Sequence, residues 1–162
     1  MLERGNVADV GRTKRLLGTM PRHPMRFVPR SMAPAVRRQA YLNWLLPLLR
    51  LAIATMWIVT GIVSLAVYPL VDSLALLART GFTGTFATIA LVTSAALDLL
   101  LGIATLVAPG RALWRFQIAL IAGYTAIISW YLPEFWAHPY GPVLKNLPIL
   151  AALLLLAYLQ ER

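Results

Sequence analysis

The feature that most constrains the fold is an unbroken apolar run from Gly84 to Ala108, whose one charged residue is Asp98. About 20 apolar residues in a helix cross the hydrocarbon core of a bilayer, which is roughly 30 Å thick. The run exceeds this length, so it predicts a transmembrane helix. A carboxylate inside such a helix costs roughly 2.5 to 3.5 kcal/mol on insertion scales and usually faces other helices or a water-filled cavity. Asp98 therefore needs a partner elsewhere in the chain.

Composition extends this conclusion to the rest of the chain. Of 162 residues, 59% are hydrophobic and 13% charged, and the apolar residues lie in long runs that soluble domains lack. We therefore expect an all-α integral membrane protein, a four-helix antiparallel bundle. Residues 1–43 are expected to form a basic cytoplasmic arm, and residues 44–162 the transmembrane domain. This length leaves no room for an additional soluble domain of ordinary size.

Four segments are expected to cross the membrane, at about residues 45–67, 84–108, 113–132 and 143–159. Pro47 would lie in the first turn of the first span, where its missing N–H costs little. Between Pro69 and Gly81 the sequence predicts a short interfacial helix, which is too brief to span. Three prolines between residues 133 and 142 predict an aromatic interfacial loop. The nearly aliphatic fourth span is expected to face lipid or another copy of the chain.

Helical spacing places the small, polar and aromatic residues of the spans on faces suited to helix contacts. In the third span Ala119 and Gly123 are expected to allow close packing, and Gln117, Tyr124 and Tyr131 share a face. The inner face of the first span consists of Arg50, Ala54, Trp57, Gly61, Ser64 and Tyr68. The inner face of the second span consists of Thr88, Leu91, Ala95, Asp98, Gly102 and Thr105.

The positive charge has a topological explanation. The net charge is +9, and more than half of the fifteen Lys and Arg residues precede the first span. Cytoplasmic loops are enriched in these residues, so both termini are expected on the cytoplasmic side of a bacterial inner membrane, and no nucleic-acid partner is expected. Arg37 and Arg38 lie beside Tyr41 and Trp44, a combination that predicts contact with lipid headgroups. A disordered tail with a membrane-proximal end is the simpler alternative.

Arg50 and Asp98 form the first candidate site. Both lie on inner faces, and their depths in antiparallel spans differ by roughly 7 Å at 1.5 Å per residue, which an arginine side chain can reach. We expect an intramembrane ion pair that acts as a packing clamp, with a ligand or proton site as the alternative. Arg50 could instead extend to the cytoplasmic surface and leave Asp98 neutral.

A second polar group lies on the outer side of the predicted bundle and consists of Glu134, His138, Lys145 and Asn146, with Asp72 and Arg79 nearby by topology. A group of surface ion pairs is the simpler interpretation. The mouth of a site for a small polar ligand or a quinone headgroup is the alternative.

Several kinds of chemistry are not expected. The chain has two histidines and no cysteine, so no metal site and no thiol redox relay are expected. The spacing of a catalytic triad, a Walker loop or a dinucleotide fingerprint is absent from the sequence.

Three segments resemble the DoxX-like family of four-helix membrane proteins over about Tyr41 to Leu159: LRLAIATMWIVTGIVSL, SAALDLLLGIATLVAP and ALIAGYTAIISWYLPEFWAHPYGPVLKNLPILA. In such relatives the domain often follows an NAD-dependent epimerase-like domain, whose Rossmann glycine motif the arm lacks. The family includes a small subunit associated with thiosulfate:quinone oxidoreduction and subunits of membrane oxidoreductase complexes. The resemblance therefore implies a quinone as cofactor and a membrane or peripheral oxidoreductase as partner.

Our leading hypothesis is a non-catalytic membrane subunit that supports such a redox enzyme. The first alternative is a small carrier or ligand-binding membrane protein in which Asp98 gains and loses a proton. The second alternative is a membrane enzyme that uses Glu134, His138 and Lys145.

Overall fold

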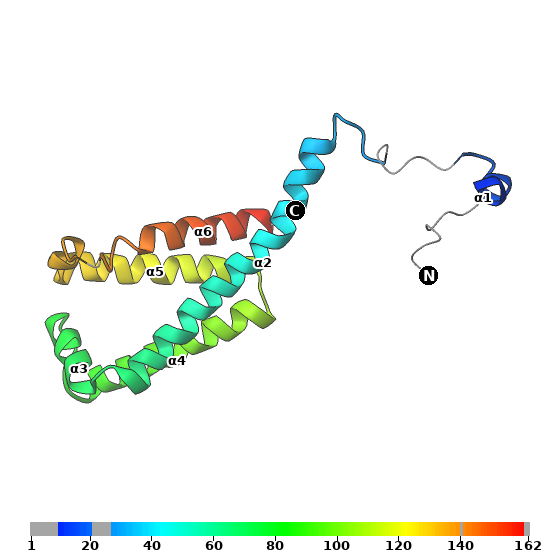
Figure 1. Cartoon of the computed structure of the whole chain (residues 1–162). Helices are drawn as coiled ribbons and strands as arrows, with labels where there is room; N and C mark the ends of the chain where they lie inside the picture. Colours follow the sequence, from blue (N-terminus) through cyan, green and yellow to red (C-terminus); the bar gives the residue numbers. More distant parts are fainter. Residues whose placement is uncertain (1–9, 21–26, 140, 161–162) are drawn as a thin grey trace, which may run out of the picture. The chain divides into compact units, whose positions relative to one another are not determined.

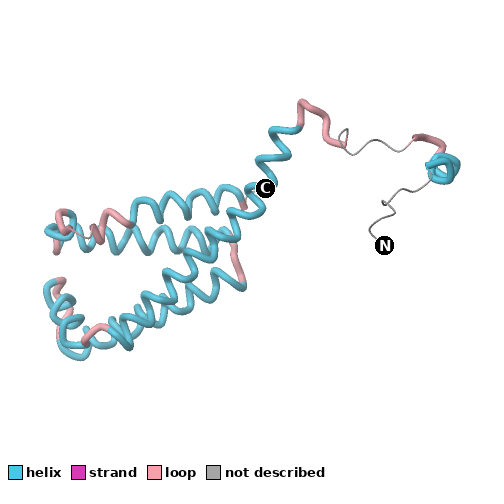
Figure 2. Tube along the Cα trace, in the orientation of Figure 1, coloured by secondary structure: helices cyan, strands magenta, loops and turns pink. Residues whose placement is uncertain are grey.

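The computed structural model describes residues 10–20, 27–139 and 141–160, and this part of the chain is helical with no strand. The all-α prediction is confirmed for these residues (Figures 1 and 2). The elements are α1 (Val10–Leu17), α2 (Ala33–Ile62) with the π-helical turn η2 (Val63–Val67), α3 (Leu70–Arg79), α4 (Gly84–Val107), α5 (Arg111–Tyr131), the 3-10 turn η3 (Pro133–Trp136) and α6 (Asn146–Leu159).

The chain divides into two compact units, residues 1–43 and 44–162, and the division falls inside α2. In the first unit the described residues are 10–20, which include α1, and 27–43, which include the start of α2. No residue of α1 is buried. The second unit contains the remaining helices and the hydrophobic core. The sites discussed below all belong to the second unit.

Among the residues that the structure describes, three helices are long and apolar enough to cross a membrane: α2 with η2, α4 and α5. The fourth apolar helix, α6, has 14 residues and is thus roughly 21 Å long, less than the hydrocarbon core. It begins at Asn146 and not at Val143, because residues 142–145 form turns. A helix from Val143 would place Pro148 in its interior, where the ring clashes with the carbonyl of Leu144.

The first long helix also begins elsewhere than expected. It starts at Ala33, so Pro47 lies in its interior and the prediction of a first-turn proline is wrong. Pro34 occupies the first turn instead, where backbone N–H groups lack intrahelical partners in any case. At Pro47 the helix loses the hydrogen bond that would join its backbone nitrogen to the Asn43 carbonyl.

Two glycines allow α2 and α4 to approach closely. A Cβ added at Gly61 would lie 2.8 Å from the Ala95 carbonyl oxygen, and one added at Gly102 would lie 2.4 Å from Cγ1 of Ile58. Real Cβ atoms do not come this close, so both positions require glycine. The predicted inner faces therefore do meet at these residues, as small residues permit between membrane helices.

The hydrophobic core joins all four apolar helices. It consists of Ile53, Trp57, Leu101, Trp114, Ile121, Leu153 and Leu156. On α5 the buried positions are Trp114, Gln117 and Ile121, which repeat at helical spacing. Ala119 and Gly123 lie on another face and are exposed, so the close packing expected of them does not occur within this chain. Tyr131 is likewise 49% exposed and adds nothing to the interior.

Candidate intramembrane binding site

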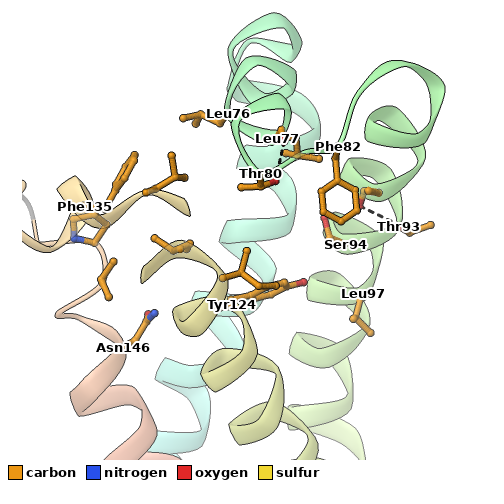
Figure 3. A pocket seen from close by; sticks show the side chains of 16 residues that line it. Leu76, Leu77, Thr80, Phe82, Thr93, Ser94, Leu97, Tyr124, Phe135 and Asn146 are labelled. Carbon is orange, nitrogen blue, oxygen red and sulfur yellow. Dashed lines mark hydrogen bonds between the residues drawn. The ribbon is translucent and has the colours of Figure 1, made fainter. Parts of the chain in front are cut away.

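A cavity of about 760 Å³ lies between α3 and α4 on one side and α5, η3 and the start of α6 on the other (Figure 3). Its volume lies within the range of roughly 300 to 1,000 Å³ that small-molecule sites occupy. Most of its wall is aliphatic or aromatic. The lining residues are Leu76, Leu77, Thr80, Phe82, Ala90, Thr93, Ser94, Leu97, Tyr124, Ile127, Ile128, Leu132, Phe135, Pro142, Val143 and Asn146.

The hydroxyl groups of three lining residues donate to backbone carbonyls of their own segment. Thr80 donates to Leu77 at 2.8 Å, Thr93 to Ile89 at 2.7 Å, and Ser94 to Leu91 at 2.9 Å. Such back-bonding uses the single hydroxyl proton of each side chain. These residues can therefore accept a hydrogen bond from a molecule in the cavity but have no donor left for it.

Asn146, predicted as part of the outer polar group, lines the cavity instead. Its side-chain Nδ2 donates to Oγ1 of Thr125 at 2.8 Å, and Thr125 donates to the Ile121 carbonyl at 2.7 Å. The bond fixes the amide, so the Asn146 carbonyl oxygen remains as an acceptor. The first turn of α6 thus contributes one oriented polar group to an otherwise apolar wall.

Tyr124 contributes the phenol of the wall and lies with Leu97 at what we call the inner end of the cavity. Figure 3 shows its oxygen directed toward α4. Asp98 follows Leu97 on α4 and is 8% exposed, and its Oδ1 has no hydrogen-bond partner. The two groups are close enough to interact electrostatically. An unpaired buried carboxylate oxygen is costly, so the inner end contains an unmet requirement for a donor.

At the opposite end an ion pair joins α3 to η3. Arg79 donates to Glu134, and each residue directly precedes a lining residue, Thr80 or Phe135. Hydrogen bonding to backbone N–H, and then to Arg79, holds the pKa of Glu134 below its usual range. Both side chains are about half exposed, so the pair adds little to the free energy of folding. The pair connects the two walls of the cavity.

The comparison with known families can now be added to this geometry. The model of the DoxX-like family matches residues 54–154, well over half of the chain. The chain belongs to the DoxX-like family. Searches of curated proteins and of solved structures found no match. The matched region runs from α2 into α6 and includes every residue that lines the cavity of this DoxX-like protein.

The remaining members of the predicted outer group do not line the cavity. His138 stacks on Phe135 with ring centroids 6.0 Å apart, while Lys145 is exposed and directly precedes α6. Asp72 is exposed in the first turn of α3. Within the described ranges no three His, Asp or Glu side chains are grouped as metal ligands.

The predicted ion pair between Arg50 and Asp98 is not formed. Arg50 Nη2 lies 3.5 Å from the Leu106 carbonyl oxygen, and its Nε has no partner, as is also true of Asp98 Oδ1. The last four carbonyls of a helix lack intrahelical donors and carry partial negative charge, so they attract a cation. The contact directs Arg50 to the C-terminal end of α4. Extension of Arg50 to the cytoplasmic surface, the alternative to the ion pair, stays a prediction.

A buried hydrogen-bond network connects three helices near the turn between α4 and α5. Trp57 Nε1 donates to Gln117 Oε1 at 3.0 Å, and Gln117 Nε2 donates to Thr105 Oγ1 at 2.8 Å. Thr105 in turn donates to the Leu101 carbonyl at 2.7 Å. Gln117 and Thr105 are fully buried. Helical spacing placed each residue on an inner face, but it did not predict that they bond to one another.

The predicted headgroup residues lie on the first turns of α2. Tyr41 is 62% exposed and Trp44 82% exposed, and Arg37 and Arg38 are exposed as well. Their contact with lipid headgroups stays a prediction. The cavity residues of α3, Leu76 and Leu77, were not anticipated. Their signal was the apolar face of a short helix with charged residues at both ends, Asp72 and Arg79.

Proposed function

We propose that this DoxX-like protein is a small non-catalytic membrane subunit that binds an isoprenoid quinone in its cavity and supports a redox enzyme. The observation that carries the proposal is the cavity itself, whose wall is apolar except for Thr80, Thr93, Ser94, Tyr124 and Asn146. A quinone combines an apolar tail with a ring that bears two oxygens. Such a molecule matches a mostly apolar site with a few placed polar groups.

The proposed partner is a membrane or peripheral oxidoreductase. Cysteine is absent from the sequence, so thiol chemistry would have to come from another protein. Family membership supports this proposal through the oxidoreductase-associated subunits that the family includes. A subunit of this kind should copurify with a larger redox enzyme from its native membrane in mild detergent. Isolation of the chain alone, with an unchanged redox activity in membranes that lack it, would contradict the proposal.

We further propose that α2, α4, α5 and α6 all lie in a bacterial inner membrane, with both termini on the cytoplasmic side and α3 at the opposite interface. Arg111 and Arg115 in the first turns of α5 support this orientation. The turn at residues 142–145 would complete the crossing that α6 is too short to make alone. Labelling of single cysteines introduced at exposed positions 79 and 111 tests the orientation, because the two sites should react from opposite sides.

Binding can be tested with the full chain in lipid nanodiscs and a short-tailed photoreactive benzoquinone. Ser94→Trp fills the cavity, so labelling should fall at least tenfold. Val92→Trp is the matched control, since Val92 lies on the same helix, is 49% exposed and does not line the cavity. The control should label like the wild type. Equal labelling of wild type and Ser94→Trp would overturn quinone binding at this site.

The second candidate is a proton-coupled carrier. The specific observation in its favour is Asp98, a buried carboxylate whose Oδ1 has no partner. Intramembrane carboxylates commonly mark proton pathways. Proton flux in proteoliposomes, measured with an enclosed pH-sensitive dye, should then disappear in Asp98→Asn. Equal flux in the wild type and this variant would exclude the carrier.

A further inference from the structure

The helix register places Tyr124 opposite Asp98. The bond between Gln117 and Thr105 fixes the alignment of the antiparallel helices α4 and α5. Two helical turns farther from their connecting turn, the same faces present Asp98 on α4 and Tyr124 on α5. Figure 3 shows the Tyr124 oxygen directed toward α4, in agreement with this register. The two unpaired polar groups at the inner end therefore face one another across the same helix interface.

The other polar side chains nearby direct hydrogen-bond donors elsewhere, and the Arg50 Nε is left without a partner. Trp57 and Gln117 donate within the buried network. The hydroxyls of Thr93 and Ser94 donate to carbonyls of α4, and Arg50 is directed to the carbonyl of Leu106. The Tyr124 hydroxyl carries a proton that no described residue accepts in this structure. This hydroxyl is therefore available to donate to Asp98 Oδ1, which has no partner.

We propose that Tyr124 donates its hydroxyl proton to a hydrogen bond with Asp98 when the cavity is occupied, so that the phenol oxygen faces the ligand as an acceptor. No proton is transferred. A phenol has one proton, and once it is engaged only lone pairs remain for the ligand. The inner end then selects a head that donates a hydroxyl, which is the quinol and not the quinone. This inference rests on the proposed function and adds a redox-state preference to it.

In this arrangement Tyr124 contacts the ligand, and Asp98 is a positioning residue that acts through it. A quinol hydroxyl donates to the Tyr124 oxygen and satisfies it. A quinone carbonyl can only accept a hydrogen bond. A bound quinone would therefore place its carbonyl oxygen against the Tyr124 oxygen with no proton between the two acceptors. Sites built around a hydrogen bond reject the analogue that cannot make it, because a buried polar group is left unpaired.

The test compares the affinities of a short-tailed benzoquinol and its benzoquinone for the full chain in nanodiscs. The wild type should bind the quinol roughly tenfold more tightly, the difference that one such hydrogen bond gives. Dithionite can keep the quinol reduced, because the sequence has no disulfide that it could cleave. Tryptophan fluorescence reports binding of both forms.

Three variants separate this role from a structural one. Tyr124→Phe should bind both forms with affinities within about twofold of each other. Tyr131→Phe, the same change on the same helix but outside the cavity, should keep the wild-type preference. Asp98→Asn should lose or reverse the preference, because an amide can donate to the phenol oxygen and turn the hydroxyl proton toward the ligand.

The outcomes distinguish the two proposals. Equal affinity of the wild type for both forms, or an unchanged preference in Tyr124→Phe, would overturn the redox-state preference while leaving quinone binding intact. Failure of the wild type to bind either form would overturn both. If Asp98→Asn does not fold, the comparison of Tyr124→Phe with Tyr131→Phe still decides the question.

Discussion

Two polar pairs on the same faces of α4 and α5 have opposite characters. Thr105 and Gln117, near the connecting turn, are fully buried and bonded to each other and to Trp57. Asp98 and Tyr124, two turns away in the same register, are not bonded, and Tyr124 lines a cavity. The first pair holds helices together, whereas the second lies where the helices enclose open space. Residues that share a helix face can therefore stabilise the fold in one place and line a binding cavity in another.

The largest effect should come from overpacking the close contact between α2 and α4 at Gly102. Gly102→Leu adds a side chain whose Cβ would lie 2.4 Å from Ile58 Cγ1 and 3.0 Å from the Ile58 backbone nitrogen. We expect a loss of about 3 kcal/mol or more in the free energy of unfolding, since the obstacle includes backbone. Thermal unfolding in detergent measures it. Gly123→Ala, which meets nothing within 4 Å, is the control and should leave the midpoint unchanged.

Gln117→Leu should break the bonded pair. The change leaves Trp57 Nε1 without its acceptor and Thr105 Oγ1 without its donor in a buried site. The expected loss is about 1 to 3 kcal/mol of unfolding free energy. Urea or guanidinium titration in mixed micelles gives the value. A stability equal to that of the wild type would show that the network does not hold the three helices.

Asp98→Leu should not lower the stability of the fold as Gln117→Leu does. It removes a buried carboxylate oxygen that has no hydrogen-bond partner and substitutes an apolar side chain. The thermal midpoint should therefore be equal to or above that of the wild type, while quinol preference is lost. A lower midpoint would mean that Asp98 is satisfied in the folded protein, and the contrast between the two pairs would then fail.

The smallest effect concerns the ion pair between Arg79 and Glu134. The pKa of Glu134 is lowered in the folded protein, so the pair stabilises the fold above the ordinary glutamate pKa of 4.5. This contribution disappears as pH falls through the lower folded pKa. The midpoint of Glu134→Gln should be slightly below that of the wild type at about pH 7, and the difference should shrink as the pH falls below 4.5. A difference that persists at low pH would assign it to something other than the carboxylate charge.

Much of the fold could be predicted because it follows from length and periodicity. The run from Gly84 to Ala108 became α4, and its predicted inner face contains Gly102 and Thr105, which do contact other helices. Boundaries set by proline were harder to predict. Pro47 lies within α2, and Pro148 delays the start of α6, because each outcome depends on where the preceding turn begins.

The site was predicted less well. The periodicity identified Asp98 and Arg50 as inward-facing, and the comparison of their depths then predicted that the two would pair. A comparison of depths takes no account of the free carbonyls at the end of α4, which attract Arg50. The role of Tyr124 depends on how far α4 and α5 separate, and that distance is a property of tertiary packing which no local pattern encodes.

Because α4 and α5 diverge from their connecting turn, that turn can act as a hinge for the two walls of the cavity. In Figure 1 the two helices lie closest near the turn at residues 108–110 and separate toward α3 and η3. Tyr124 lies roughly 10 Å along the axis from Gln117, so a rotation of about 5° at the bonded pair moves it by roughly 1 Å. The same rotation moves the far wall, roughly twice as distant, by about 2 Å. A small rotation near the turn therefore produces a larger change in the width of the cavity. The ion pair between Arg79 and Glu134 joins the walls at the end where this displacement is largest.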